Sequence, residues 1–121
     1  MLYLMLIYHP EMVWDSRTKA EQETIYREYR QLIDELTAAG KYKAGNQLEA
    51  SKAASTVRVR NGRPVVTDGP FAETKEQLGG FCYVEAEDLQ EAQAIAARIP
   101  SAREGSIEVR PVIPRQQAAQ A

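Results

Sequence analysis

The uninterrupted apolar stretch Leu2–Tyr8 predicts a central β-strand that is covered on both faces. Pro10 ends this strand, because proline cannot donate a hydrogen bond to a sheet ladder. A second strand with apolar residues on both faces is predicted at residues 80–86. A last strand is predicted at residues 106–112, where apolar and charged residues alternate.

Between these strands lie one weaker strand pattern and one clear hairpin. Residues 41–49 mix apolar and polar positions, which predicts an irregular strand around Gly45. Residues 56–60 and 63–67 are expected to form the two strands of the hairpin, since valine and arginine alternate in the first of them. Asn61-Gly62 joins the two strands and favours the positive φ angles of a two-residue turn.

Two amphipathic helices are predicted, and each begins with a capping-box pattern. Thr18 and Glu21 start the longer helix, in which apolar residues recur at helical spacing until Gly40. Asp88 and Glu91 start the shorter helix, which Pro100 stops. Its apolar face is predicted to hold Leu89, Ala92, Ile95, Ala96 and Ile99.

The order strand, helix, strand, hairpin, strand, helix, strand matches an α+β fold, the ferredoxin-like βαββαβ plan with an added hairpin strand. Two helices cover only one face of such a sheet. Because Leu2–Tyr8 is apolar on both faces, we expect a second copy of the chain to cover the other face in a homodimer. Residues 1–114 are assigned to one domain. Residues 115–121 are assigned to a flexible C-terminal tail, whose Gln and Ala residues offer nothing large to bury.

Charge and composition argue against several classes of function. Fifteen basic and seventeen acidic residues give a formal net charge of −2, so no direct binding of nucleic acid is expected. The longest apolar run is too short to span a bilayer and lacks the basic leading segment of a secretory signal, so we expect a cytoplasmic protein with no membrane contact. With one cysteine and one histidine, neither a disulfide within the chain nor a cysteine cluster for zinc is expected, and no cofactor is predicted.

A long motif begins in the second hairpin strand, where residues 65–81 read VVTDGPFAETKEQLGGF. This run resembles the signature stretch of the DGPF branch of YCII-related proteins. The resemblance extends to residues 4–8, 57–64 and 107–112 and leaves out only the tail and the helix surfaces. It implies a dimeric α/β-barrel arrangement, in which two ferredoxin-like sheets face each other around a cleft. It also implies two associations, since wider relatives are suspected of acid–base chemistry with a His and Asp pair and DGPF members often occur beside or fused to alternative sigma factors.

The loop of this motif carries the residues that we consider for ligand binding. Acids and an amine in a loop between strands can converge on a small polar ligand. A charged residue on the last strand would need a partner inside the sheet, such as one of these acids. We therefore predict that one partly buried pocket is shared by Asp68, Glu73, Lys75 and Arg110. The alternative is structural, with Asp68 capping the turn while Gly69 and Pro70 set its backbone.

His9 and Cys82 are the remaining chemical candidates. His9 ends the first strand, and an imidazole there can carry a proton into a cleft, so His9 and Asp68 form the predicted catalytic set. A lone histidine is, however, more often structural. Cys82 lies within an apolar strand, which favours a buried thiol over a reactive nucleophile. Gly79-Gly80 lacks the context of a phosphate loop and favours close packing or a bulge.

Three functional hypotheses follow. The first is a small dimeric protein that binds a small polar molecule in its cleft, with acid–base catalysis as an open question. The second is a protein-interaction module that modulates a sigma factor or a related transcription component, motivated by the resemblance alone. The third is a structural dimer without a ligand. Convergent polar side chains in the cleft would favour the first hypothesis, and an exposed apolar surface away from the dimer contact would favour the second.

Overall fold

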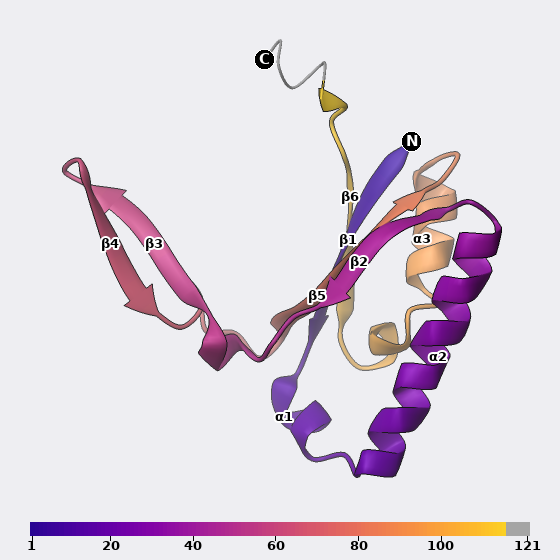
Figure 1. Ribbon diagram of the computed structural model, residues 1–121, viewed down its shortest axis with the longest axis horizontal. Helices are drawn as coiled ribbons and strands as arrows, with labels where there is room; N and C mark the ends of the chain where they lie inside the picture. The colour runs from indigo at the N-terminus through magenta and orange to yellow at the C-terminus, as the bar shows by residue number, and fades with distance from the viewer. Residues whose placement is uncertain (116–121) are drawn as a thin grey trace.

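A computed structural model of the chain describes residues 1–115, so that all but the first residue of the predicted tail lies outside the described residues. Helices, strands and short 3₁₀ turns follow one another along the chain (Figure 1). Their order is β1 (Leu2–His9), α1 (Glu11–Asp15), α2 (Lys19–Ala38), β2 (Tyr42–Gln47), η1 (Ser51–Ala53), β3 (Ser55–Arg60), β4 (Arg63–Asp68), β5 (Gln77–Glu85), α3 (Leu89–Ala96), η2 (Pro100–Arg103) and β6 (Ser106–Pro111).

Four strands form the main sheet in the order β2-β5-β1-β6, and all of its neighbouring strands are antiparallel. This is the strand order of a ferredoxin-like fold, with α2 and α3 as the two crossover helices that cover one face (Figure 1). The predicted α+β fold class is therefore confirmed. The irregular strand expected around Gly45 is β2, which contains a register shift between Tyr42 and Ala44.

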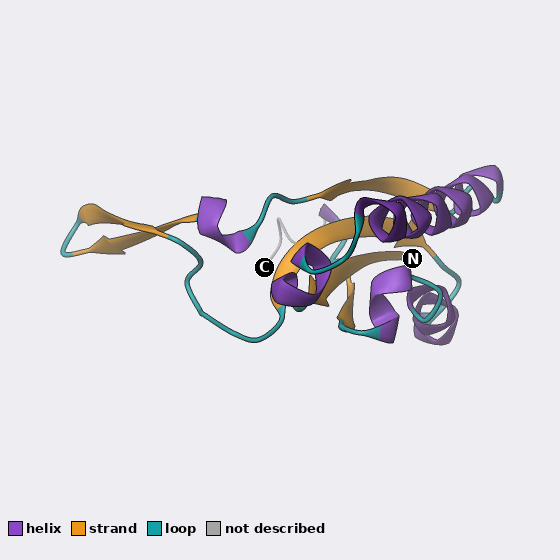
Figure 2. Cartoon of the chain, turned by 90° about the horizontal axis from the view of Figure 1, so that it is seen from below, coloured by secondary structure: helices purple, strands orange, loops and turns teal. Residues whose placement is uncertain are grey.

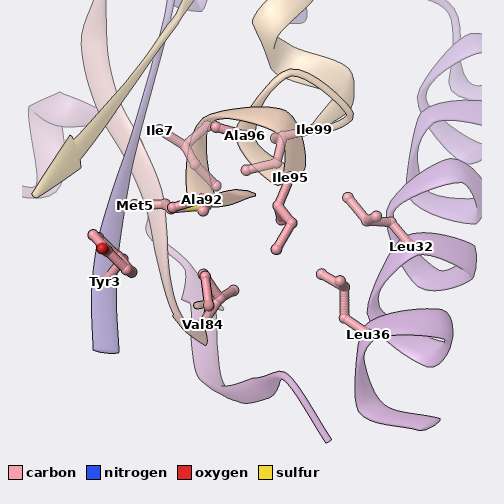
Figure 3. Close-up of a cluster of buried hydrophobic side chains, with 11 residues drawn as sticks. Tyr3, Met5, Ile7, Leu32, Leu36, Val84, Ala92, Ile95, Ala96 and Ile99 are labelled. Atoms are coloured by element: carbon pink, nitrogen blue, oxygen red, sulfur yellow. The ribbon is translucent and has the colours of Figure 1, made fainter. Parts of the chain in front are cut away.

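Alternation along β1 separates the two faces of the sheet. Tyr3, Met5 and Ile7 are buried toward the helices, whereas Leu4 and Leu6 point to the opposite face and are only partly buried. The core lies on the helix side (Figure 3). Its buried side chains are Tyr3, Met5, Ile7, Leu32, Leu36, Val84, Ala86, Ala92, Ile95, Ala96 and Ile99.

The opposite side, which we call the helix-free face, carries partly buried apolar side chains along its centre. Leu6 is paired with Phe81 and Leu4 with Tyr83, and the two aromatic rings lie edge to face with centroids 6.3 Å apart. Residues 80–86 were predicted to be covered on both sides, but within one chain Phe81 and Tyr83 have no helix above them. The helix-free face thus presents Leu4, Leu6, Phe81 and Tyr83, bordered by Glu108 and Arg110 of β6.

The helix starts follow the capping patterns, one of them completely. The Thr18 hydroxyl accepts a hydrogen bond from the Glu21 N–H (3.1 Å), and the Glu21 carboxylate accepts one from the Thr18 N–H (2.9 Å), which completes the predicted capping box of α2. At α3 only half of the box forms. The Asp88 carboxylate accepts from the Glu91 N–H (2.8 Å), but Glu91 accepts from the Glu87 N–H (3.1 Å). Leu89, predicted for the buried face of this helix, is 44% exposed.

The hairpin is where the structure departs most from the sequence-based plan. Asn61 and Gly62 have φ angles of 53° and 75°, as the predicted two-residue turn requires. Its strands β3 and β4, however, do not add to the main sheet. They form a separate two-stranded sheet that projects away from the rest of the molecule (Figures 1 and 2). The described residues contain no helix long and apolar enough to cross a membrane.

Candidate functional site

A cavity of about 710 Å³ lies between α2 and the covered face of the sheet, a volume within the usual range of roughly 300–1,000 Å³ for small-molecule sites. Its walls come from segments far apart in sequence. The end of β1, the short helix α1, one side of α2, strands β2 and β5 and the turn η2 all contribute. A space assembled from so many elements cannot be recognised from any single motif.

Aromatic rings form much of the wall of this cavity. Trp14 and Tyr26 lie edge to face with ring centroids 5.4 Å apart, and the Arg17 guanidinium lies 5.8 Å from the centre of the Trp14 ring. Tyr29 and Tyr42 also line the cavity. Aromatic side chains offer flat apolar surface together with a few polar atoms, which suits a planar ligand.

Several polar groups of the lining are held by contacts within the protein. The Tyr29 hydroxyl is hydrogen-bonded to the Ser101 hydroxyl (2.5 Å), and burial raises the pKa of Tyr29, which keeps this hydroxyl protonated. The Gln47 amide donates to the Tyr26 hydroxyl (3.2 Å). These hydrogen bonds hold the Tyr29 and Tyr26 hydroxyl groups in place in the cavity wall, where a ligand could form hydrogen bonds with them.

The arginines of the lining differ in how far they are engaged. Arg17 is paired with Glu104, and Arg103 donates two hydrogen bonds to Glu28 (2.7 and 2.9 Å). Arg30 also lines the cavity and, among residues 1–115, has no ion pair. A guanidinium without an acidic partner can receive an anionic oxygen of a ligand.

His9 is placed by an irregularity in the sheet. Ile7 is paired with Gly80 and Tyr8 with Leu78, so Gly79 is an extra residue of β5 that bulges from the ladder. A Cβ atom on Gly79 would overlap the Nε2 and Cδ2 atoms of His9. Glycine is therefore needed for the imidazole to lie where it does, which confirms the prediction of close packing or a bulge at Gly79-Gly80.

The His9 side chain borders two cavities. Besides the large one, it lines a smaller cavity of about 400 Å³ beside α1, together with Glu11, Asp15 and Glu49. The described residues contain no cluster of three or more histidine, cysteine or acidic side chains arranged to hold a metal ion. Because it borders both cavities, the His9 imidazole is placed to exchange a proton with an occupant of either.

Glu11 ties the start of α1 to the base of the hairpin. Its carboxylate accepts hydrogen bonds from the Ser51 backbone N–H (2.6 Å) and the Ser51 hydroxyl (2.5 Å). The hydrogen bond from the Ser51 side chain is the main reason that the pKa of Glu11 lies below its usual value of 4.5. The contact joins residues 40 positions apart and fixes one wall of the smaller cavity.

Glu11→Gln is expected to lower the free energy of unfolding by about 1 kcal/mol at neutral pH, the usual net value of a hydrogen bond, here to a partly buried carboxylate. Because the folded state lowers the pKa of Glu11, this stabilisation is present above pH 4.5 and is lost as the pH falls through the lowered pKa. Urea unfolding of both proteins from pH 7 to pH 3 measures the difference. Glu73→Gln, which removes an exposed carboxylate, is the control for the loss of one negative charge. A difference for Glu11→Gln that persists at pH 3 would contradict the assignment.

Cys82 also lines the large cavity, but its environment opposes reactivity. Burial raises the pKa of the Cys82 thiol to about 11, so the thiolate is scarce at neutral pH. The thiol is only partly buried, but its raised pKa agrees with the prediction that it is not a reactive nucleophile. The remaining chemical groups of the cavity are His9, the tyrosine hydroxyl groups, the arginines and the carboxylate of Asp34.

The four residues predicted to share a pocket are not gathered around a cavity within one chain. Asp68, Glu73 and Lys75 are exposed, and none of the four lines either of the two cavities. Arg110 lies on the helix-free face beside Leu4, with its guanidinium 3.7 Å from the Glu108 carboxylate. Their role in ligand binding stays a prediction.

The alternative of Asp68 as a turn cap also finds no support in the hydrogen bonds. Among residues 1–115, the Asp68 carboxylate accepts none. The turn is held instead by the Gly69 N–H, which donates to the Ala54 carbonyl (2.7 Å), and by the Thr56 hydroxyl, which donates to the Gly69 carbonyl (2.8 Å). Gly69 has a φ angle of 94°, which accounts for glycine at this position.

Sequence reasoning overlooked most of the cavity lining. Trp14, the only tryptophan, lies on a five-residue helix that the apolar pattern did not predict. The available signal was on α2, where Tyr26, Tyr29 and Arg30 follow at spacings that place them on one side of a helix. That spacing predicts a shared face but not that the face borders an empty space.

Comparisons with known proteins agree with this architecture. The family model described as "YCII-related domain" matches residues 1–116. An uncharacterized protein of Rhizobium meliloti (strain 1021) is 40% identical over 114 residues, which cover 93% of this chain and 92% of that protein. The solved structure of 5-chloro-2-hydroxyhydroquinone dehydrochlorinase from Burkholderia phenoliruptrix, in complex with 2,5-dihydroxybenzoquinone, is similar with a TM-score of 0.51 at 18% identity. That match covers 97% of this chain and 98% of the other, and it shows that the fold is shared.

Proposed function

The chain belongs to the YCII-related domain family, and from that premise we propose that it binds a small, planar, polar molecule in the cavity beneath α2, with His9 as the group that exchanges a proton with it. The observation that carries the proposal is the 710 Å³ cavity, which His9 borders at a position set by the Gly79 bulge. The structurally similar dehydrochlorinase was solved with a dihydroxybenzoquinone, which supports the choice of ligand class.

The lining explains why a planar and anionic ligand is the best fit. Trp14, Tyr26 and Tyr29 offer flat apolar surfaces. Arg30 offers a positive charge without an acidic partner among the described residues, and the protonated Tyr29 hydroxyl offers a polar contact. An imidazole is suited to proton transfer near neutral pH, which makes acid–base catalysis the reaction class that we propose for this site.

We test this with 2,5-dihydroxybenzoquinone as the probe, titrated into the full chain and followed by calorimetry and by NMR shifts. The expected result is saturable binding that shifts the signals of His9 and Tyr29. His9→Gln should weaken binding about tenfold or more, because the amide keeps a polar group but does not exchange a proton with the ligand. Met12→Ala is the control, since Met12 is 85% exposed and lines neither cavity. No saturable binding, or equal weakening by both variants, would count against the site.

The functional unit that we propose is a homodimer joined through the helix-free face. In one chain this face leaves Leu4, Leu6, Phe81 and Tyr83 without a covering layer, and an apolar sheet face of this kind is normally buried against a second layer. A second copy of the same face satisfies this need with one two-fold axis. Arg110 and Glu108 would then lie at the rim of the dimer contact, the usual place for charged side chains.

The alternative of a protein-interaction module keeps one observation in its favour. Phe71 in the DGPF loop is 81% exposed, and the hairpin beside it exposes several valines. These apolar side chains lie outside the helix-free face and are available for a protein contact. Nothing in their chemistry singles out a sigma factor.

A further inference from the structure

Two strands of the main sheet contribute glycines to the lining of the large cavity. Gly45 lies on β2, and Gly79 and Gly80 lie on β5. At Gly79 the place of the missing side chain is taken by the imidazole of His9. At Gly45 it is taken by the hydroxyl group of Tyr42, because a Cβ atom on Gly45 would overlap the Tyr42 Oη atom. The sheet therefore holds two functional side chains, each in the space that a glycine leaves open.

Tyr42 reaches this position through an irregularity of β2. Lys43 is an extra residue in the ladder, because the residues on either side of it are paired with the consecutive β5 residues Val84 and Tyr83. Residues three positions apart on a regular strand point to opposite faces. With the extra residue, Tyr42 and Gly45 instead share the helix side of the sheet, so the tyrosine ring can lie along its own strand.

The Tyr42 hydroxyl is a hydrogen-bond donor that borders the cavity. Within residues 1–115 it takes part in no hydrogen bond, whereas the hydroxyl groups of Tyr26 and Tyr29 in the same wall are both engaged within the protein. Burial raises the pKa of Tyr42, which keeps its hydroxyl protonated at neutral pH. Such a hydroxyl can donate to an oxygen of a bound molecule.

The Tyr42 hydroxyl and the His9 imidazole are separated along β5. Gly45 is paired with Cys82, so the hydroxyl lies beside Cys82, while the imidazole lies beside Gly79. Three positions along a strand correspond to roughly 10 Å. A six-membered ring with an oxygen at each end can bridge such a gap through two hydrogen bonds of about 2.8 Å.

We propose that the ligand of this cavity is a conjugated ring with an oxygen at each end, and that Tyr42 donates a hydrogen bond to the oxygen farther from His9. This inference rests on the function proposed above and narrows its ligand class. When His9 accepts a proton from one end of the ring, the negative charge spreads through the conjugated system to the oxygen at the other end. The Tyr42 hydroxyl stabilises that charge with a donor that is already in place.

The test compares Tyr42→Phe with Tyr83→Phe in the full chain. Each change removes one hydroxyl that makes no hydrogen bond within residues 1–115, but Tyr83 lies on the helix-free face and lines neither cavity. For 2,5-dihydroxybenzoquinone, calorimetry should show binding about tenfold or more weaker for Tyr42→Phe, the usual loss for one hydrogen bond to a charged oxygen, and a change of less than about threefold for Tyr83→Phe. Thermal unfolding should stay the same for both variants, since neither hydroxyl holds the fold. Equal affinities of the unchanged chain and Tyr42→Phe would overturn the role of Tyr42.

A local readout places the contact at the hydroxyl itself. In chains with isotopically labelled tyrosine, the Cζ signal that disappears in Tyr42→Phe should shift as the quinone saturates the unchanged chain, and the signal that disappears in Tyr83→Phe should not. A shift at His9 without one at Tyr42 would overturn this inference and leave the proposed function standing. If the quinone does not bind the unchanged chain at all, the proposed function fails and this inference fails with it.

Discussion

If the proposed dimer forms through the helix-free face, Leu6→Glu is expected to convert it into a monomer at micromolar concentration. Leu6 lies at the centre of the helix-free face, between Phe81 on one side and Glu108 on the other. A carboxylate there would be buried in the proposed contact without a partner. Burying an unpaired charge costs several kcal/mol, which corresponds to a rise of 100-fold or more in the dissociation constant, at about 1.4 kcal/mol per tenfold.

Light scattering and sedimentation measure this effect, and Leu89→Glu is the matched control. Leu89 is an exposed leucine on α3, the opposite side of the sheet, so the same change there should leave the mass unchanged. Circular dichroism checks that both variants stay folded. The dimer proposal fails if the unchanged protein is monomeric at micromolar concentration or if Leu6→Glu leaves the mass of a dimer.

The parts of the fold that could be predicted are those that depend on local patterns. Thr18 and Glu21 mark the start of α2 because a capping box needs only four consecutive residues. Asn61-Gly62 marks the hairpin because few other dipeptides tolerate two positive φ angles. The alternation along β1 predicted two apolar faces and hence a need for cover on the side without helices.

The separate hairpin sheet could not be predicted in the same way. Alternating valines show that β3 and β4 pair with each other, but the pattern is the same whether or not the pair joins a larger sheet. The deciding features lie at its ends, where the 3₁₀ turn at Ser51–Ala53, anchored by Glu11, and the loop after Asp68 separate the hairpin from β2 and β5. Such anchoring is tertiary and leaves no periodic trace in the sequence.

In the candidate site, too, residues marked by a local sequence pattern could be predicted, and residues placed by tertiary contacts could not. His9 was identified from its residue type and its place at a strand end, and it does border both cavities. Asp68, Glu73 and Lys75 were chosen because they crowd one loop, yet closeness in sequence did not place them at a cavity. Trp14 and Arg17 were missed because their contribution depends on how α1 folds back toward α2, where the Gln22 amide donates a hydrogen bond to the Trp14 carbonyl (3.1 Å).

Gly79→Ala is expected to lower the free energy of unfolding by about 1–3 kcal/mol, the usual cost of forcing an extra methyl group into a packed site. Apart from the residues next to it in the chain, the new Cβ would overlap only the His9 ring. The ring must therefore move. Ligand binding should weaken in parallel, as is expected for His9→Gln, because the imidazole leaves its place between the cavities.

The double variant Gly79→Ala with His9→Ala separates this mechanism from a general strain of the bulge. Once the ring is absent, the added methyl group has room, and replacing glycine also restricts the unfolded chain, which stabilises by about 0.4–1 kcal/mol. The double variant should therefore be as stable as His9→Ala alone or slightly more stable, which makes the two changes strongly non-additive. Gly80→Ala is the control, because its Cβ would lie 3.1 Å from the Asn46 carbonyl oxygen and does not meet His9, so its cost should be the same with or without the imidazole. Thermal and urea unfolding of the five variants and the unchanged chain complete the cycles. Additive costs for Gly79→Ala and His9→Ala would show that the bulge rejects alanine for a reason other than His9, and the link between Gly79 and the position of the imidazole would be lost.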